Sequence, residues 1–357
     1  MKDRNSDVSI VEIQRENQQL KEQIREINNT LQEFYEAYSE LIKSSTENMN
    51  KIVSVSKCIK FLQVNLDNLK YEILDPKSSQ VRYFYPEFRS DEDTIRLIME
   101  EKKSLARFGD GEFSIAFNIP RQKFQRLDDR LAKRIWEVLN GETPENLLIA
   151  IAKQYGNLDR FSEQAAQGIR LYMAEEIRRQ HQEILPSNRV YSDAYITRPY
   201  ILFKDMFSEA PGKRFEALKQ IWKDKKVIVV EGAQTRLGVG NDLFGQARDI
   251  KRVLAPAVSS FDRYDDIYRE CLKQGDSADL FLLAIGPSSG VLAFDLSKKS
   301  FQAVDVGHID LEYEWFLAGQ GIRVSVPHKY NNEISGGDVV SEIHDPVYNS
   351  QIVASFA

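Results

Sequence analysis

The first seventy residues carry an apolar side chain at nearly every third or fourth position. When Ile10 is taken as position a of a heptad, apolar residues fill most a and d positions up to Ile73, and no proline or glycine interrupts them. Such a repeat is typical of a helix that packs against a partner helix, and β-branched residues at several a positions favour a parallel dimer. We therefore predict that residues 1–75 form a coiled coil that makes the protein a homo-oligomer through residues 10–73. The alternative is a helical hairpin that folds back on itself or on the main domain.

A different pattern follows the proline and serines that end this repeat near Pro76. Residues 76–90 are interpreted as a linker, and residues 91–357 as one domain in which short apolar runs alternate with amphipathic segments. The pattern predicts strands at 104–109, 147–152, 226–231, 251–255, 279–285, 303–306 and 322–326, and helices at 91–103, 241–249, 262–273, 290–298 and 311–318. Alternating strands and helices predict an α/β fold with a mostly parallel sheet, whose ligands bind beyond the carboxyl ends of the strands.

Composition and charge narrow the classes of function. Hydrophobic residues make up 42% of the chain, the net charge is −6 and the two cysteines are far apart. A mildly acidic chain without a long basic run is not expected to bind nucleic acid, and two cysteines suit a reducing compartment. The charged first residues and the lack of a run of 18 apolar residues predict neither a secretory signal nor a transmembrane helix. We expect a cytoplasmic protein whose contact with the inner face of the membrane, if it has one, is peripheral.

A glycine-rich segment follows the predicted strand at 226–231. Gly238 and Gly240 would allow backbone amides to approach an anion, and Asn241 could cap the helix predicted next. Arg236 adds a guanidinium group that can hold a phosphate with two donors. The segment is therefore interpreted as a phosphate-binding loop, although a turn that only tightens packing would have the same glycines.

Two carboxylates flank a glycine in the segment 107–112, which follows another predicted strand. Asp110 and Glu112 can turn towards one site and provide the hard oxygen ligands that Mg²⁺ or Mn²⁺ prefers. A metal ion there would neutralise charge on a departing nucleoside diphosphate. Because Asp-Gly is also a common turn pair, the segment alone does not distinguish a metal site from a simple turn.

Three further segments carry candidate binding residues. Gly286-Pro287-Ser288-Ser289-Gly290 is either part of a nucleotide or sugar pocket or a tight turn. In the segment 305–315, His308 could bind a phosphate or a metal, or act as an acid or base, and Asp310 could be a catalytic carboxylate or only a helix cap. The segment 192–200 combines aromatic side chains with arginine and aspartate, which suits a sugar-binding wall or an ordinary strand edge.

Taken together, the segments 107–112, 231–243, 285–287 and 305–315 resemble, in order, the GT-D-type glycosyltransferases, a bacterial family that was long a domain of unknown function. The resemblance covers about residues 81–357 and excludes the coiled coil. It implies a Rossmann-like GT-D fold, a DxE motif at Asp110 and Glu112, a divalent metal ion (Mn²⁺ or Mg²⁺) and a UDP-sugar donor. The residues that it places at the donor are Arg107, Phe108, Gly109, Arg236, Gly238, Gly240, Asn241, Pro287 and His308.

The function that we predict is transfer of a hexose, glucose above all, from a UDP-sugar to a hydroxyl group of a growing glycan or glycoprotein. Asp110 and Glu112 would hold the metal ion, and His308 or Asp310 could deprotonate the acceptor. Other glycosyltransferases are candidate partners. One alternative is another Rossmann-type enzyme such as an oxidoreductase, against which the missing G-x-G-x-x-G sequence argues. The other is a non-catalytic coiled-coil scaffold that binds sugar nucleotides.

Overall fold

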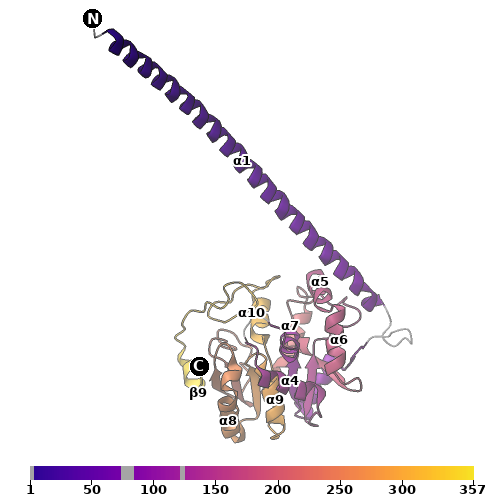
Figure 1. Ribbon diagram of the computed structural model, residues 1–357. Helices are drawn as coiled ribbons and strands as arrows, with labels where there is room; N and C mark the ends of the chain where they lie inside the picture. The colour runs from indigo at the N-terminus through magenta and orange to yellow at the C-terminus, as the bar shows by residue number, and fades with distance from the viewer. Residues whose placement is uncertain (1–3, 74–83, 121–124) are drawn as a thin grey trace. The chain divides into compact units, whose positions relative to one another are not determined.

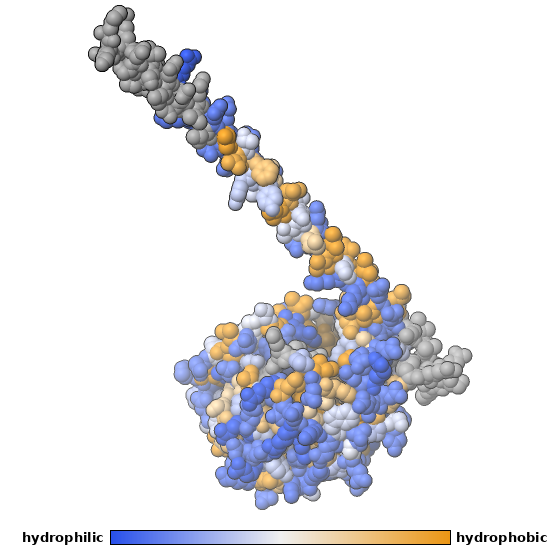
Figure 2. Space-filling view, viewed as in Figure 1, coloured by the Kyte–Doolittle hydropathy of each residue, from blue (hydrophilic) through white to orange (hydrophobic). Residues whose placement is uncertain are grey.

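The computed structural model describes residues 4–73, 84–120 and 125–357, and its N-terminal part is one long helix (Figure 1). Helix α1 (Arg4–Ile73) runs for 70 residues without a turn, so the predicted helix is confirmed and a hairpin within it is wrong. The chain divides into two compact units, residues 1–64 and residues 65–357, and α1 is continuous across that boundary. Apolar side chains recur along α1 (Figure 2).

The second unit is built on one sheet. Among the described residues, nine strands pair in the order β1-β4-β3-β2-β8-β7-β5-β6-β9, and every pair of neighbours is parallel. The predicted α/β fold with a parallel sheet is therefore confirmed. The strands are β1 (Glu87–Phe88), β2 (Ser104–Phe108), β3 (Leu147–Ile151), β4 (Val190–Asp193), β5 (Lys226–Gly232), β6 (Asp249–Ala255), β7 (Leu280–Ala284), β8 (Ala303–Asp305) and β9 (Ile352–Ser355).

Helices cover both faces of this sheet, which is why its central strands are continuous apolar runs. One face packs against α3 (Asp110–Ala116), α4 (Asp129–Asn140), α5 (Glu163–Tyr172), α6 (Glu175–Ile184), α8 (Tyr264–Gln274) and α9 (Ser288–Ser297). The other packs against α2 (Asp91–Glu100), α7 (Ala210–Lys219) and α10 (Ile309–Leu317). Alternate residues of one strand serve the two cores: Ile228 and Val230 of β5 belong to the first, and Val227 and Val229 to the second.

A capping side chain fixes the start of helix α2. The Oγ atom of Ser90 accepts a hydrogen bond from the amide of Asp93 at 3.0 Å, and α2 begins at Asp91, where the predicted helix begins. The helix ends at Glu100, three residues earlier than predicted, and Lys102 adopts a left-handed conformation with φ of 52°. A short helix, α11 (Pro346–Gln351), precedes the edge strand β9.

The helix predicted at 241–249 is wrong. The Oδ1 atom of Asn241 accepts a hydrogen bond from the amide of Leu243 at 3.0 Å, which closes a turn instead of beginning a helix. Leu243 and Phe244 are buried and hold these turns against the core. The amphipathic pattern was therefore produced by two anchoring side chains and not by a helical face.

The strand predicted at 322–326 is also wrong. This segment is irregular, its Ile322 side chain is exposed, and the carbonyl oxygen of Val324 accepts a hydrogen bond from Trp315 of α10 at 3.0 Å. The edge position in the sheet is taken by β9, which the sequence did not predict. Strand β1 lies within the predicted linker at 76–90, and residues 76–83 of that linker lie outside the described residues.

The strand order of the sheet reverses between the two central strands, β2 and β8. From β2 the chain continues to β3 on one side, whereas β8 is reached from β7 on the other side. Loops diverge at such a point and leave a crevice beyond the carboxyl ends of the strands, where ligands bind in open α/β sheets. Within the described residues, no helix is both long and apolar enough to cross a membrane.

Candidate functional site

A cavity of about 230 Å³ lies beyond the carboxyl ends of the central strands, at the predicted crevice. Its lining includes three stretches at the ends of neighbouring strands. They contribute Arg107, Gly109, Asp110, Gly111 and Glu112 at and beyond the end of β2; Gly286 and Pro287 after β7; and Asp305, Gly307, His308 and Asp310 at and beyond the end of β8. The segment 231–243 also reaches the lining, through Thr235 and Leu237, so all four sequence segments meet at one pocket.

The two carboxylates of the segment 107–112 lie at the start of α3. Gly109 precedes the helix, and its amide donates to Oε2 of Glu112 at 2.7 Å, which fixes the direction of the glutamate side chain. Asp110 is exposed, whereas Glu112 is half-buried. Burial raises the pKa of Glu112 to about 7, the amide of Gly109 opposes this, and the charges of Asp305 and Asp110 raise it further. This electrostatic effect is expected for carboxylates that face the same space.

A divalent cation held by these carboxylates would have to be shared with a substrate. Within the described ranges, no group of three or more histidine, cysteine, aspartate or glutamate side chains is arranged to hold a metal ion. A pair of carboxylates, Asp110 and Glu112, leaves the remaining coordination positions to water and to phosphate oxygens. Mg²⁺ in particular is usually bound in this way, through one or two carboxylates together with substrate phosphates.

Arg107, at the end of β2, also lines the pocket and is held between a carbonyl and a carboxylate. Its Nε atom donates to the carbonyl oxygen of Ala194 at 3.0 Å, and its Nη1 atom lies 3.4 Å from Oδ1 of Asp305. Burial raises the pKa of Asp305 to about 6, although Arg107 and the amide of Gly307 both act to lower it. A Cβ atom at Gly307, where φ is 49°, would lie 2.2 Å from Nη1 of Arg107. Glycine at this position therefore leaves room for the guanidinium group.

Glu333 collects three cationic or potentially cationic side chains at another wall of the pocket. Nη2 of Arg198 donates to both Oε atoms at 2.6 Å, Nε of Arg323 lies at 3.1 Å, and Nδ1 of His308 lies at 3.5 Å. Burial alone would raise the pKa of Glu333, but these positive charges outweigh it and hold the pKa far below its usual range. Burial lowers the pKa of His308 to about 4, so this histidine is neutral at pH 7.

Beneath Arg198 lies a second, fully buried carboxylate. Oε2 of Glu312 accepts hydrogen bonds from the amides of Tyr200 and Ile201, at 3.2 and 2.9 Å, and its Oε1 lies 3.5 Å from Nε of Arg198. Burial acts to raise the pKa of Glu312, and the charge of Arg198 acts to lower it. The two glutamates therefore fix both the position and the charge of Arg198 in the pocket wall.

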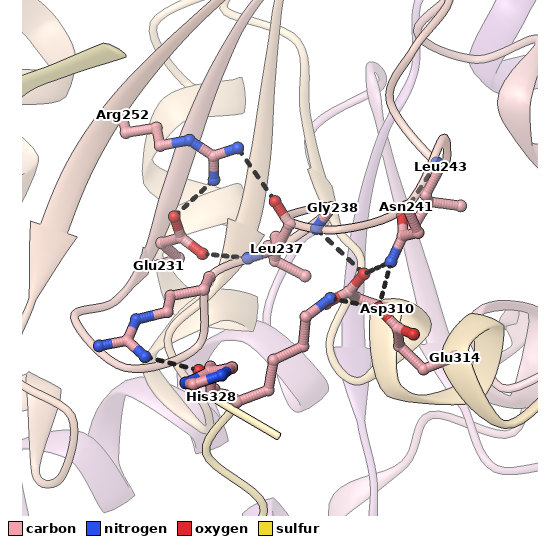
Figure 3. Close-up of polar contacts among 11 residues, drawn as sticks. Glu231, Leu237, Gly238, Asn241, Leu243, Arg252, Asp310, Glu314 and His328 are labelled. Atoms are coloured by element: carbon pink, nitrogen blue, oxygen red, sulfur yellow. Dashed lines mark hydrogen bonds and ion pairs between the residues drawn. The ribbon is translucent and has the colours of Figure 1, made fainter. Parts of the chain in front are cut away.

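The glycine-rich segment after β5, predicted to bind phosphate, makes several polar contacts with other parts of the protein (Figure 3). No helix follows it, so the expected helix N-terminus is absent. The amide of Gly238 donates to Oδ1 of Asp310 at 3.0 Å, and Asn241 donates to Asp310 and Glu314. Arg236 donates to two backbone carbonyls, those of His328 and Ser341.

From this segment, only residues adjacent to the predicted phosphate ligands line the pocket. Thr235 and Leu237 line the pocket, whereas Arg236, Gly238, Gly240 and Asn241 do not. Arg236 and Gly240 instead border a separate cleft that also contains His328 and His344.

Asp310 lies in the pocket lining, but both of its oxygens are engaged. Oδ1 accepts from Gly238 and Asn241, and Oδ2 lies 2.7 Å from Nζ of Lys329, a side chain that is itself buried. Asp310 therefore holds the loops together and is poorly placed to remove a proton from a substrate. Phe108, another predicted donor contact, is 0% exposed and packs in the core behind the pocket.

Sequence analysis missed several pocket residues, for different reasons. Asp305 stood in the segment singled out at 305–315 but was read as the end of a strand. Arg198 belonged to the segment 192–200, in which no single residue was chosen. Glu333 had no local signal, because it lies in an irregular stretch whose position depends on contacts with Arg198 and Arg323.

Comparison with known proteins assigns the second unit to a described family. The family "Glycosyltransferase GT-D fold" matches residues 105–334. Glycosyltransferase GlyD of Streptococcus pneumoniae is 36% identical over 265 residues, which are 74% of this chain and 32% of that protein. The probable glycosyl transferase Gly of Streptococcus gordonii is 32% identical over 290 residues, or 81% of this chain and 41% of that protein. The chain thus spans about a third to two fifths of the length of these curated relatives.

Solved structures agree with this assignment. A structure described as a new glycosyltransferase (DUF1792) from Streptococcus sanguinis superposes with a TM-score of 0.71 at 32% identity, and the match covers 76% of this chain and all of that one. A second structure, described as a domain of unknown function 1792 with a distinct glycosyltransferase fold, gives a TM-score of 0.70 at 32% identity over 76% of this chain and 95% of that chain.

Proposed function

Since this chain belongs to the glycosyltransferase family with the GT-D fold, we propose that it transfers a hexose from a UDP-sugar to a hydroxyl group of a glycan or glycoprotein. The observation that carries the proposal is the pair Asp110 and Glu112, which lines a pocket beyond the carboxyl ends of β2 and β8 together with Arg107 and Arg198. Carboxylates for a cation and fixed positive charges are what a departing nucleoside diphosphate requires.

The pocket lining suits the two ends of such a donor. Ile115, Ile119 and Leu127 give one part of it an apolar lining, on which a planar base could lie. Asp110 and Glu112 would hold Mn²⁺ or Mg²⁺ together with the diphosphate, and the ion would supply positive charge to the leaving group. UDP-glucose is the donor that we propose first.

In the reaction, an acceptor hydroxyl oxygen forms a bond to the anomeric carbon of the hexose. The bond between that carbon and the diphosphate oxygen breaks, UDP leaves with the electron pair, and the acceptor loses its proton. Arg107 and Arg198 would stabilise the negative charge that develops on UDP. Neutral His308 would act as a hydrogen-bond partner in the pocket, and we assign Asp310 a structural role in place of a catalytic one.

The family assignment argues against a nucleotide-dependent oxidoreductase, whereas a non-catalytic scaffold is a rival that experiment must exclude. A reducing cytoplasm is the compartment that we propose, because both cysteines, Cys58 and Cys271, are free.

A panel of nucleotide sugars tests the proposal directly. The full chain is incubated with each donor, in Mn²⁺ or in EDTA, and release of the nucleoside diphosphate is measured with and without glycan acceptors. We expect metal-dependent release of UDP, with losses of about 100-fold or more in Asp110→Asn and Glu112→Gln. Glu101→Gln is the matched control, since Glu101 is an exposed carboxylate at the opposite edge of the sheet, just before β2 begins.

Two outcomes would contradict this mechanism. UDP binding without turnover for any donor would favour the scaffold. Turnover that is unchanged in EDTA and in Glu112→Gln would remove the proposed metal site, while leaving the transferase activity in place.

A further inference from the structure

Helix α1 presents a long row of exposed apolar side chains. With Ile10 at position a, the apolar a and d side chains between Ile27 and Leu66 are 52% to 69% exposed. Isolated exposed apolar residues are ordinary on a protein surface, but a row of this length is not. The row is interrupted by one polar layer, formed by Ser45 and Asn48.

In the middle of α1 the apolar face is wider than a two-helix seam. Tyr35, Ile42 and Met49 occupy three successive e positions and are 72%, 49% and 59% exposed. The g positions beside them are small, with Ala37 and Ser44. A dimeric coiled coil buries mainly positions a and d, whereas a helix in a larger bundle buries three positions of every seven.

Charges are distributed in a way that suits identical partners. Between residues 28 and 65, Lys51 is the only charged residue at any e or g position, while glutamates such as Glu33 and Glu40 and lysines such as Lys43 and Lys57 lie at the outer b, c and f positions. Identical helices therefore meet without like-charge repulsion. The mixture of acidic and basic residues on the outer face does not favour an anionic membrane surface.

The apolar area is sufficient for stable association. About a dozen half-exposed or more exposed apolar side chains offer on the order of 1,000 Å² per helix, compared with about 800 Å² per partner in a typical stable interface. We propose that α1 associates with the α1 helices of other copies of this chain, in a bundle of more than two helices. The occupant of the row is thus the same segment of a second and a third copy.

The last turns of α1, from Asn65 onward, belong to the second unit and are bound within it. Glu72 and Arg170 of α5 form a two-bond ion pair at 2.6 and 3.0 Å, and the amide of the Asn68 side chain donates to the carbonyl oxygen of Arg170. The guanidinium group of Arg178 lies 3.8 Å from the ring centroid of Tyr71. Association of α1 would therefore hold several copies of the pocket in one assembly, whichever reaction that pocket performs.

Solution mass measures the assembly without any substrate. The full chain of 41.2 kDa is examined by sedimentation equilibrium or multi-angle light scattering, and we expect at least three times this mass. Leu41→Glu combined with Ile52→Glu should reduce it to the monomer. Replacing Tyr35, Ile42 and Met49 with glutamine should reduce the stoichiometry while leaving the a and d positions intact. Lys43→Glu combined with Lys57→Glu, on the outer face, is the matched control and should leave the mass unchanged.

Each alternative result is decisive. A monomeric full chain, with the row covered by its own second unit or left open, overturns the proposal. A full chain that is a dimer overturns the wider bundle, as does a larger assembly whose mass is insensitive to the three e-position changes. Thermal unfolding of the second unit, followed by tryptophan fluorescence, shows whether a variant has lost its mass because it no longer folds.

Discussion

A buried ion pair joins the neighbouring strands β5 and β6 and offers a direct test of how this domain is held together (Figure 3). Oε1 of Glu231 lies 2.6 Å from Nη1 of Arg252, and the two side chains are 0% and 4% exposed. The amide of Leu237 donates to the other carboxylate oxygen at 2.6 Å, and Arg252 donates in turn to Leu237 and Gln351. The pair therefore fastens both the glycine-rich loop and the C-terminal segment.

Removing only the arginine should be costly. In Arg252→Met the carboxylate of Glu231 is left in the core without its cation, and removal of one partner of a buried pair typically costs about 3–5 kcal/mol. In the double variant with Glu231→Gln, the glutamine still accepts from Leu237 but carries no charge. We therefore expect the double variant to be more stable than Arg252→Met by roughly 2 kcal/mol.

Urea unfolding followed by tryptophan fluorescence measures these differences, because Trp136, Trp222 and Trp315 all lie in the second unit. Burial already raises the pKa of Glu231 against the effect of Arg252. Without the arginine the carboxyl pKa rises further, so the folded variant binds a proton more readily than the unfolded chain. Its stability is therefore lost as pH rises, and the cost of Arg252→Met should be larger at pH 7 than at pH 5.

A cost at pH 7 below about 1 kcal/mol, the range of an exposed ion pair, would refute this reasoning. A double variant no more stable than the single one would do the same, since the effect would then lie in packing and not in an unpaired charge.

Two other substitutions test the pocket and a buried histidine. Gly307→Ala should weaken binding of UDP with Mn²⁺ in calorimetric titration, because the new Cβ atom meets Arg107. Gly319→Ala is the control: its φ is 61° and no atom lies within 4 Å, so it carries the same backbone strain of about 1 kcal/mol without that contact. Equal binding by both variants would exclude a role for Arg107. Burial lowers the pKa of His181 to about 3, so only the unfolded chain binds this proton between pH 6.5 and 3, and stability falls with falling pH by up to about 1.4 kcal/mol per unit. In His181→Asn the slope of unfolding free energy between pH 6.5 and 5 should be smaller, and identical slopes would contradict the assignment.

The sequence predicted those strands whose own residues form a recognisable hydrophobic pattern. Continuous apolar runs identified β3, β5 and β7, because a strand covered by helices on both faces needs no polar alternation. Strands β4 and β9 are four residues each and were missed, since β4 has one large buried hydrophobic side chain and β9 lies half-exposed at the edge. The segment 322–326 alternates like a strand but does not join the sheet, and it packs on α10 instead.

The candidate site could be predicted where a chemically suitable side chain also lies directly after a strand. Asp110, Glu112 and His308 follow strand ends, and the rule for parallel sheets places such residues at one edge. Asp310 illustrates the limit, because the same carboxylate that could serve as a base is engaged by Gly238, Asn241 and Lys329 from distant parts of the chain. Glu333 could not be predicted from the sequence for a related reason: its position depends only on long-range contacts.

The central pairing of β2 with β8 also determines when the pocket can form during synthesis and folding. The two walls of the pocket meet through residues 198 positions apart in the chain, Arg107 and Asp305. Closing so long a loop delays native contacts, because its entropy must be offset before the contacts form. A nascent chain that ends before β8 has the first carboxylate pair but no opposite wall. Such a chain, whether still on the ribosome or cut short by a stop codon, is therefore expected to hold no donor.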